Sequence, residues 1–188
     1  MFTMNNVTLI CLLLAVATTL GAQSFLQPFE GVSRKKPSYI TLKNGKELEG
    51  TTKNLDRKKG LIEEIKIEVD GKKQKIKAED IKHMYLPASN FAKLMNATEI
   101  ATDATKWESD DLDEEHLKDG YAYFELATVQ IKKKKQRDLL LQLVNPNFAN
   151  GIRVYHDPFA RETAGIGVAG IQVAGGLEKS YYVKKGKE

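Results

Sequence analysis

The sequence has a single cysteine, Cys11, which lies inside an apolar run near the N-terminus. If that run is removed, the chain keeps no thiol, which excludes disulfides, a zinc-thiolate site and a cysteine nucleophile. Cys11 also lacks the small neighbours of a lipid-modified cysteine. Stability therefore has to come from packed apolar surface, and a chain of 188 residues is long enough to bury a core without covalent staples.

Lysine and arginine are absent from residues 1–6, but the apolar run over residues 7–22 ends in the small-residue site Ala22-Gln23-Ser24. This pattern is typical of a secretory signal peptide. The run is shorter than the roughly 20 apolar residues that a membrane-spanning helix needs. We predict a signal peptide over residues 1–24 and an exported protein, periplasmic or extracellular, without stable membrane insertion after cleavage. Envelope association and an uncleaved anchor are the alternatives.

The charges are unevenly spread. The net charge is +5 over residues 25–82, −6 over residues 83–120 and +5 over residues 121–188. Arginine is scarce and the aromatic residues are not interleaved with the lysines, so we do not expect nucleic-acid binding. Lysines on exposed and edge strands also prevent sheets from aggregating. The basic segments leave an anionic envelope polymer as one candidate partner and an envelope protein as the other.

The best-defined pattern covers residues 38–88. Residues 25–37 precede it and read as a flexible, extended lead-in. Apolar and polar residues then alternate, interrupted by the turn dipeptides Asn44-Gly45 and Asp70-Gly71. Gly50 predicts a bulge or bend within the second strand, and residues 79–80 predict one tight helical turn. The spacing of these five short strands resembles that of small SH3-like or Sm-like barrels.

The period changes after this unit. Apolar residues at helical spacing predict a helix over residues 89–107, and an acidic linker completes the segment 89–120. Residues 121–188 read as a second antiparallel β-unit, which ends in a hairpin around Gly175-Gly176. The predicted fold class is therefore mainly β with a short helical connector: a small SH3-like barrel followed by a second antiparallel β-unit. Whether the two units form one body stays open.

Two motifs invite a chemical interpretation that their context does not favour. The string from Gly165 to Gly170 matches G-x-G-x-x-G, but no strand-helix-strand unit surrounds it, so no cofactor is predicted. The acidic residues of the stretch 110–115 lack the alternating ligands and central glycine of an EF-hand loop. We interpret that stretch as a solvated linker and predict no metal site.

His156 and Asp157 form the one local pair with catalytic residue types. A histidine beside a carboxylate can act as a metal ligand or a general base. The structural interpretation is that Asp157-Pro158 ends a strand in a turn, with Asp157 capping and His156 half exposed. The other histidines, His83 and His116, lie in different segments, and their spacing gives no reason to join them to this pair.

Four phrases, ITLKNGKELEG, EDIKHMYLP, VYHDPFARETAG and KSYYVKKG, together with the layout of the chain, resemble exported proteins of unknown function in Bacteroidota-type bacteria. The resemblance implies export and no catalytic residue. We therefore expect a non-catalytic binding or structural module of the cell envelope. The alternative is a metal-assisted or hydrolytic enzyme centred on His156 and Asp157.

Overall fold

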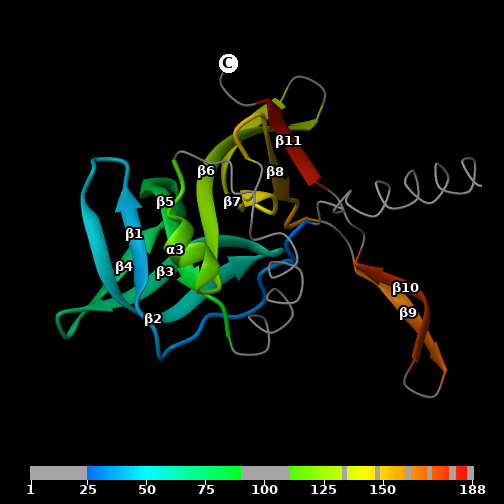
Figure 1. Cartoon of the computed structure of the whole chain (residues 1–188), viewed down its shortest axis with the longest axis horizontal. Helices are drawn as coiled ribbons and strands as arrows, with labels where there is room; N and C mark the ends of the chain where they lie inside the picture. Colours follow the sequence, from blue (N-terminus) through cyan, green and yellow to red (C-terminus); the bar gives the residue numbers. More distant parts are fainter. Residues whose placement is uncertain are drawn as a thin grey trace, which may run out of the picture.

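The computed structural model describes residues 25–89, 111–132, 135–146, 149–159, 162–168, 171–177 and 181–185. These residues are mainly β with one short helix, which confirms the predicted fold class (Figure 1). The strands are β1 (Ser38–Leu42), β2 (Glu47–Lys58), β3 (Leu61–Val69), β4 (Lys72–Lys77), β5 (Ile81–Pro87), β6 (Tyr121–Lys132), β7 (Lys135–Gln142), β8 (Ile152–His156), β9 (Glu162–Val168), β10 (Ile171–Leu177) and β11 (Tyr181–Lys185); a 3-10 turn, η1 (Ala78–Asp80), and a helix, α3 (Glu114–Lys118), complete the elements.

The first five strands and the turn between the fourth and fifth follow the sequence pattern. Gly45 and Gly71 adopt φ angles of 84° and 75° in the two predicted hairpin turns, a region that glycine enters without a steric cost. Asp80 ends η1, in the place where the sequence predicted one helical turn. Local turn chemistry therefore determined where these strands begin and end.

Seven strands form one antiparallel sheet in the order β4-β3-β2-β1-β5-β6-β7. The sheet is not the closed barrel that the sequence suggested for residues 38–88. Instead, β5 pairs with β6, and the register places Met84 opposite Phe124. The first hairpin of the second β-unit thus continues the sheet of the first. The sheet nevertheless curls, because β7 comes back against β3 and η1.

The curl begins at Gly50. The part of β2 up to Gly50 pairs with β1, and the part from Thr51 onward pairs with β3. A Cβ atom at Gly50 would lie 2.4 Å from the carbonyl oxygen of Glu68, so only glycine lets the two backbones come this close. The bend that the sequence predicted at this position is present.

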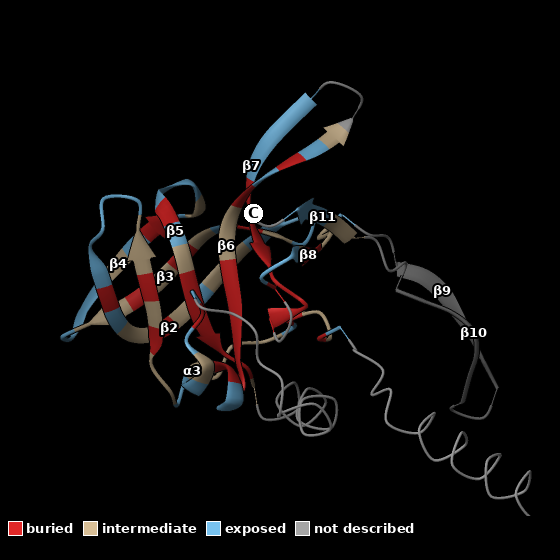
Figure 2. Ribbon diagram, turned by 45° about the horizontal axis from the view of Figure 1, so that its top comes forward, coloured by how far each residue is buried: buried red, intermediate tan, exposed pale blue. Residues whose placement is uncertain are grey.

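The sheet buries side chains on both faces (Figure 2). The three consecutive leucines of β7 show this directly, because Leu140 joins the core inside the curl while Leu139 and Leu141 join a second core outside it. Neighbouring residues of a strand point to opposite faces, so an unbroken leucine run needs apolar partners on both sides. The inner core holds the isoleucines of β3, and the outer core holds Tyr155 of β8 and Leu117 of α3.

The segment before β1, expected to be flexible, is extended and bound to the sheet. The amide of Leu26 donates to the carbonyl of Val144 at 2.7 Å, and the amide of Ser33 donates to the carbonyl of Pro87 at 2.8 Å. Leu26 and Phe29 are buried. The segment stays in place because its apolar side chains complete the core at the end of the sheet.

The second β-unit differs from its prediction in one respect. Gly175 and Gly176 do not form a turn; they lie inside β10, which pairs with β9. The last strand, β11, pairs with β8, so that Tyr181 lies opposite His156. The G-x-G-x-x-G string therefore begins in β9, and its last two positions lie outside the described residues.

Two sequence predictions lie outside the described residues: the signal peptide over residues 1–24 and, beyond Ser89, the helix over residues 89–107. The short helix α3 falls instead in the stretch that we expected to be an acidic linker, where the Asp113 side chain caps the helix by accepting from the amide of His116. Among the described residues, the search for a helix long and apolar enough to cross a membrane finds none.

Candidate functional site

His156 ends β8 and Asp157 follows it, and their roles there depend on the turn. Asp157 Oδ1 accepts a hydrogen bond from the amide of Phe159 at 2.9 Å, which is the predicted capping of the Asp-Pro turn. His156 is half-buried. Burial lowers the pKa of its imidazole, and the charge of Asp157 opposes the shift without cancelling it. His156 is therefore neutral at neutral pH.

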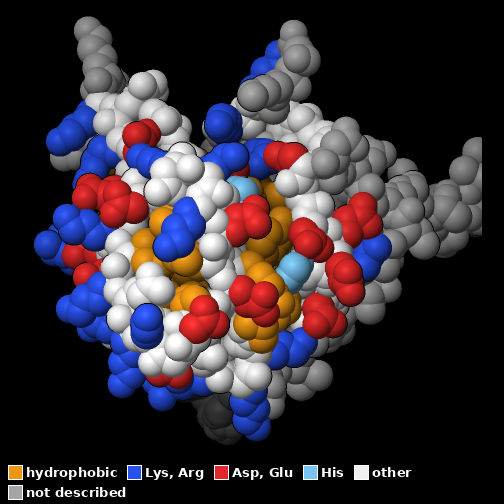
Figure 3. Space-filling view, turned by 90° about the vertical axis from the view of Figure 1, so that its left-hand side faces the viewer, with side chains coloured by type: hydrophobic (Ala, Val, Ile, Leu, Met, Phe, Trp, Pro, Cys, Tyr) orange, Lys and Arg blue, Asp and Glu red, His pale blue; other side chains and the backbone are white. Residues whose placement is uncertain are grey.

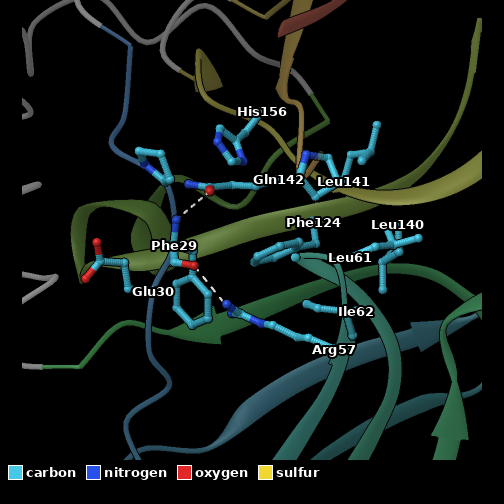
Figure 4. Close-up of a pocket in the computed structure, with 13 residues that line it drawn as sticks. Phe29, Glu30, Arg57, Leu61, Ile62, Phe124, Leu140, Leu141, Gln142 and His156 are labelled. Carbon is cyan, nitrogen blue, oxygen red and sulfur yellow. Dashed lines mark hydrogen bonds between the residues drawn. The ribbon is translucent and has the colours of Figure 1, made fainter. Parts of the chain in front are cut away.

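His156 lines a cavity of about 310 Å³ at the end of the sheet, which we name the Arg57 cavity. Figure 4 shows His156 and Arg57 on opposite sides of the cavity, and the ring of Phe124 lies between them in that view. Most of the lining side chains are apolar, and the polar ones are Glu30, Arg57, Gln142 and His156. The full lining is Pro28, Phe29, Glu30, Arg57, Gly60, Leu61, Ile62, Phe124, Leu140, Leu141, Gln142, His156 and Pro158.

The N-terminal segment forms one wall of this cavity, and the buried Gln142 holds it there. Gln142 Oε1 accepts from the amide of Phe29 at 2.7 Å, and Gln142 Nε2 donates to the carbonyl of Gln27 at 2.9 Å. The ring of Phe29 meets Phe124 edge to face, with centroids 5.5 Å apart. Because both polar ends of Gln142 are paired, a polar side chain can lie in the core without an unsatisfied group.

A second hollow, of about 510 Å³, lies on the outer face of the sheet, and we name it the His83 groove. Its residues are Tyr39, Ile40, Thr41, Glu47, Leu48, Glu49, His83, Tyr85, Asp111, Asp113 and His116. The strand register explains the set, because Tyr39 of β1 lies between Glu49 and Tyr85, and Thr41 lies between Glu47 and His83. Figure 3 views this side of the molecule, where acidic and histidine side chains surround hydrophobic ones.

A β-bulge turns His83 toward the groove. Strict alternation along β5 would place Ile81, His83 and Tyr85 on one face. The register shifts, however, so that Thr41 pairs with His83 while the next residue of β1 pairs with Ile81. The extra residue lets Ile81 enter the inner core while His83 and Tyr85 face outward.

Aromatic rings form the floor of the groove. The ring of His116, from α3, lies 4.2 Å from that of Tyr39 and 5.1 Å from those of Tyr85 and Tyr121, between centroids. The hydroxyl of Tyr85 accepts a hydrogen bond from the amide of Asp113 at 2.8 Å, which fixes the start of α3 over the sheet. Burial, followed by the proximity of Tyr39, raises the pKa of Tyr121 to about 12, so this hydroxyl is neutral.

His116 makes a close contact with the residue that caps its own helix. Its Nδ1 lies 2.6 Å from Asp113 Oδ2, an ion-pair distance whose angle falls short of a hydrogen bond. Burial alone would raise the pKa of Asp113, but the hydrogen bond from the backbone amide of His116 and the close contact with its imidazole outweigh burial and hold the pKa below its usual value. Desolvation lowers the pKa of His83, so its half-buried ring is neutral at neutral pH.

A charged network supports the groove from the side of β8. Arg153 Nη1 pairs with Glu125 Oε1 at 2.7 Å, and its Nη2 contacts Asp111. The hydroxyl of Tyr155 donates to the same Glu125 oxygen at 2.6 Å. Burial would lower the pKa of Arg153, but its bonds to Glu125 raise it, so the guanidinium stays charged. The network has a structural role, because it ties Asp111 and β8 to β6.

The sequence named His156 and Asp157 but missed the convergence of His83 and His116. These two histidines line the His83 groove, whereas His156 lines the Arg57 cavity. Asp80 lines neither hollow. Within the described part of the chain, no group of three or more histidine and carboxylate side chains is arranged to hold a metal ion. Comparison with family models, curated proteins and solved structures finds no match for this chain.

Proposed function

We propose that this chain is an exported, non-catalytic binding module that engages a basic segment of an envelope protein through the His83 groove. The observation that carries the proposal is the pairing of an aromatic floor with carboxylates that have no counter-ion. Glu47 and Glu49 are exposed at the groove, and among the described residues neither carboxylate has an ion-pair partner.

The groove's chemistry favours a cationic side chain. Among the described residues, no lysine or arginine lines it. Tyrosine faces and carboxylates together attract lysine or arginine by cation–π and ionic contacts. The same chain contains an example of the arrangement: Lys36 Nζ lies 5.6 Å from the centroid of Tyr121 and 2.7 Å from Asp119 Oδ2. A partner's basic residue over Tyr39 would reproduce this contact.

The basic strands support an anionic polymer as a partner less well. Lysines of β2 and β3 pair with neighbouring carboxylates: Lys53 with Glu68 at 3.2 Å and Lys66 with Asp56 at 2.9 Å. These exposed pairs add little stability, but they reduce the positive field of that face.

The enzyme alternative has less support at the position where the sequence suggested it. One oxygen of Asp157 is occupied by the turn, and His156 faces a mainly apolar cavity without a second histidine. Export is proposed from the sequence pattern of residues 1–24. Mass spectrometry of the exported protein should find an N-terminus between Gln23 and Phe25, and recovery of the intact chain in membranes would favour the anchor.

A titration with an oligolysine peptide tests the groove, with oligoglutamate and an anionic polysaccharide as comparison probes. The double substitution Glu47→Gln and Glu49→Gln should abolish salt-sensitive oligolysine binding. Glu63→Gln and Glu79→Gln, at carboxylates outside the groove, should preserve it. A basic envelope protein captured by the wild-type chain and lost with the first double variant would support the proposal. Equal capture by both double variants, or preferred binding of the polysaccharide, would contradict it.

A further inference from the structure

Among the described residues, the cation that lines the Arg57 cavity has no counter-ion. Arg57 Nη2 donates one long hydrogen bond, 3.3 Å, to the carbonyl of Phe29, and its guanidinium lies 5.7 Å from the centroid of that ring. A guanidinium has five N–H donors, so most remain available to a ligand. No carboxylate among the described residues lies within ion-pair distance of Arg57.

Arg57 is exposed at the rim of the cavity, where the ring of Phe29 shields one side of its guanidinium. Desolvation lowers the pKa of Arg57, and no neighbouring acid opposes the effect. Among the described residues, Glu30 is the one carboxylate of the lining; it is exposed, and Figure 4 shows its side chain directed away from Arg57. A partly shielded charge gains more from an anion than a fully solvated charge does.

The rest of the lining suits an apolar chain. Phe124 and Leu140 belong to the inner core and present apolar surface to the cavity, and Leu61 and Ile62 extend that surface along the start of β3. The volume, about 310 Å³, lies at the lower end of the range for small-molecule sites, which are mostly apolar with a few polar anchors. His156 adds a polar but uncharged group at the opposite side.

We infer that the Arg57 cavity binds a small carboxylic acid with an apolar tail, whose carboxylate is held by Arg57 and whose tail lies against Phe124 and Leu140. This site is separate from the His83 groove and selects the opposite charge, so it goes beyond the proposed function. Arginine is suited to the role because its planar fork holds a carboxylate through two parallel hydrogen bonds.

Octanoate is the probe, with octylamine and octanol as ligands of matched tail and different head. Titration into the isotope-labelled mature chain, followed by NMR, should give saturable octanoate binding with shifts at Arg57, Phe124 and Leu140. Octanol should bind more weakly and octylamine should not bind. Absence of saturable octanoate binding up to about 10 mM, or equal binding of octylamine, would overturn the inference.

Matched variants identify the contact. Arg57→Gln should weaken octanoate binding about tenfold or more, while Arg137→Gln, an exposed arginine of β7 outside this cavity, should leave it unchanged. If Arg57→Gln fails to fold, Arg57→Lys provides the test, since it keeps the charge but loses the bidentate fork and should weaken binding by a smaller factor. Wild-type affinity in whichever of these variants folds would overturn the assignment. Leu61→Phe should fill the cavity and weaken the binding of both octanoate and octanol. Unchanged binding of both would place the ligand elsewhere.

Discussion

Replacing Gln142 tests how the segment before β1 is held. This side chain is 4% exposed and forms two hydrogen bonds to the backbone of the N-terminal segment, one to the amide of Phe29 and one to the carbonyl of Gln27. Gln142→Leu keeps the volume and removes both bonds. Gln142→Ala also opens a void beneath Phe29.

The expected magnitude follows from these two bonds. Each contributes about 0.5 to 1.5 kcal/mol net, and an orphaned buried amide costs more than the bond is worth, so Gln142→Leu should destabilise by about 2 to 3 kcal/mol. Gln142→Ala should cost somewhat more, because the void is added. Release of the segment limits both losses, since a free segment regains water as a partner. Gln136→Ala, an exposed glutamine on the same strand, should stay within about 0.5 kcal/mol of wild type.

Urea unfolding measures these free energies, and hydrogen exchange locates the change. The amide of Phe29 is bonded to Gln142 and should lose its protection in Gln142→Leu. If the whole segment is released, the amides of Leu26 and Ser33, bonded to the sheet itself, should lose protection as well. Wild-type protection at Phe29 together with an unchanged urea midpoint would refute the reasoning.

Three further predictions concern the core, a turn and pH. Ile67 is fully buried, so Ile67→Ala should lower the free energy of unfolding in urea by about 2 to 5 kcal/mol, and Ile67→Val by about 0.5 to 1.5 kcal/mol. Equal losses for the two variants would contradict the cavity argument. Gly60→Ala should lower the melting temperature more than Gly71→Ala, because both have positive φ but only a Cβ at Gly60 meets a backbone oxygen, at 2.3 Å. Burial lowers the pKa of His83 and His156 below 6.5, so the unfolded chain binds protons first as pH falls. The histidine contribution to stability should be fully present above about pH 6.5 and decline as the pH falls through the lowered pKa values; replacing both histidines with glutamine should flatten the decline below about pH 6.5.

The candidate sites were only partly accessible from the sequence. His156 and Asp157 stood out because they are adjacent, and the Asp-Pro turn gave Asp157 its capping role. His83 and His116 carried no comparable signal, since 32 residues of chain separate them and a bulge in β5 decides which way His83 faces. A pattern with a strict period of two cannot reveal a bulge.

The role of Arg57 could not be predicted from the sequence either. In the sequence it belongs to a basic turn and reads as an ordinary surface charge. Only the return of the N-terminal segment brings Phe29 to its guanidinium, and the return of β7 completes the cavity beside it. Contacts between distant segments set its environment, and no local pattern encodes them.

What the sequence determined by itself was local: the mainly β class, the hairpin turns at Asn44-Gly45 and Asp70-Gly71, and the bend at Gly50. These features depend on backbone freedom and on the alternation of neighbouring residues, which act over a few positions. The tertiary structure decided that β5 pairs with β6, that β11 pairs with β8, and that Gln142 fastens the N-terminal segment. Those pairings join residues far apart in the chain, and they are selected by the total apolar area buried and by the pairing of every polar group that is buried with it.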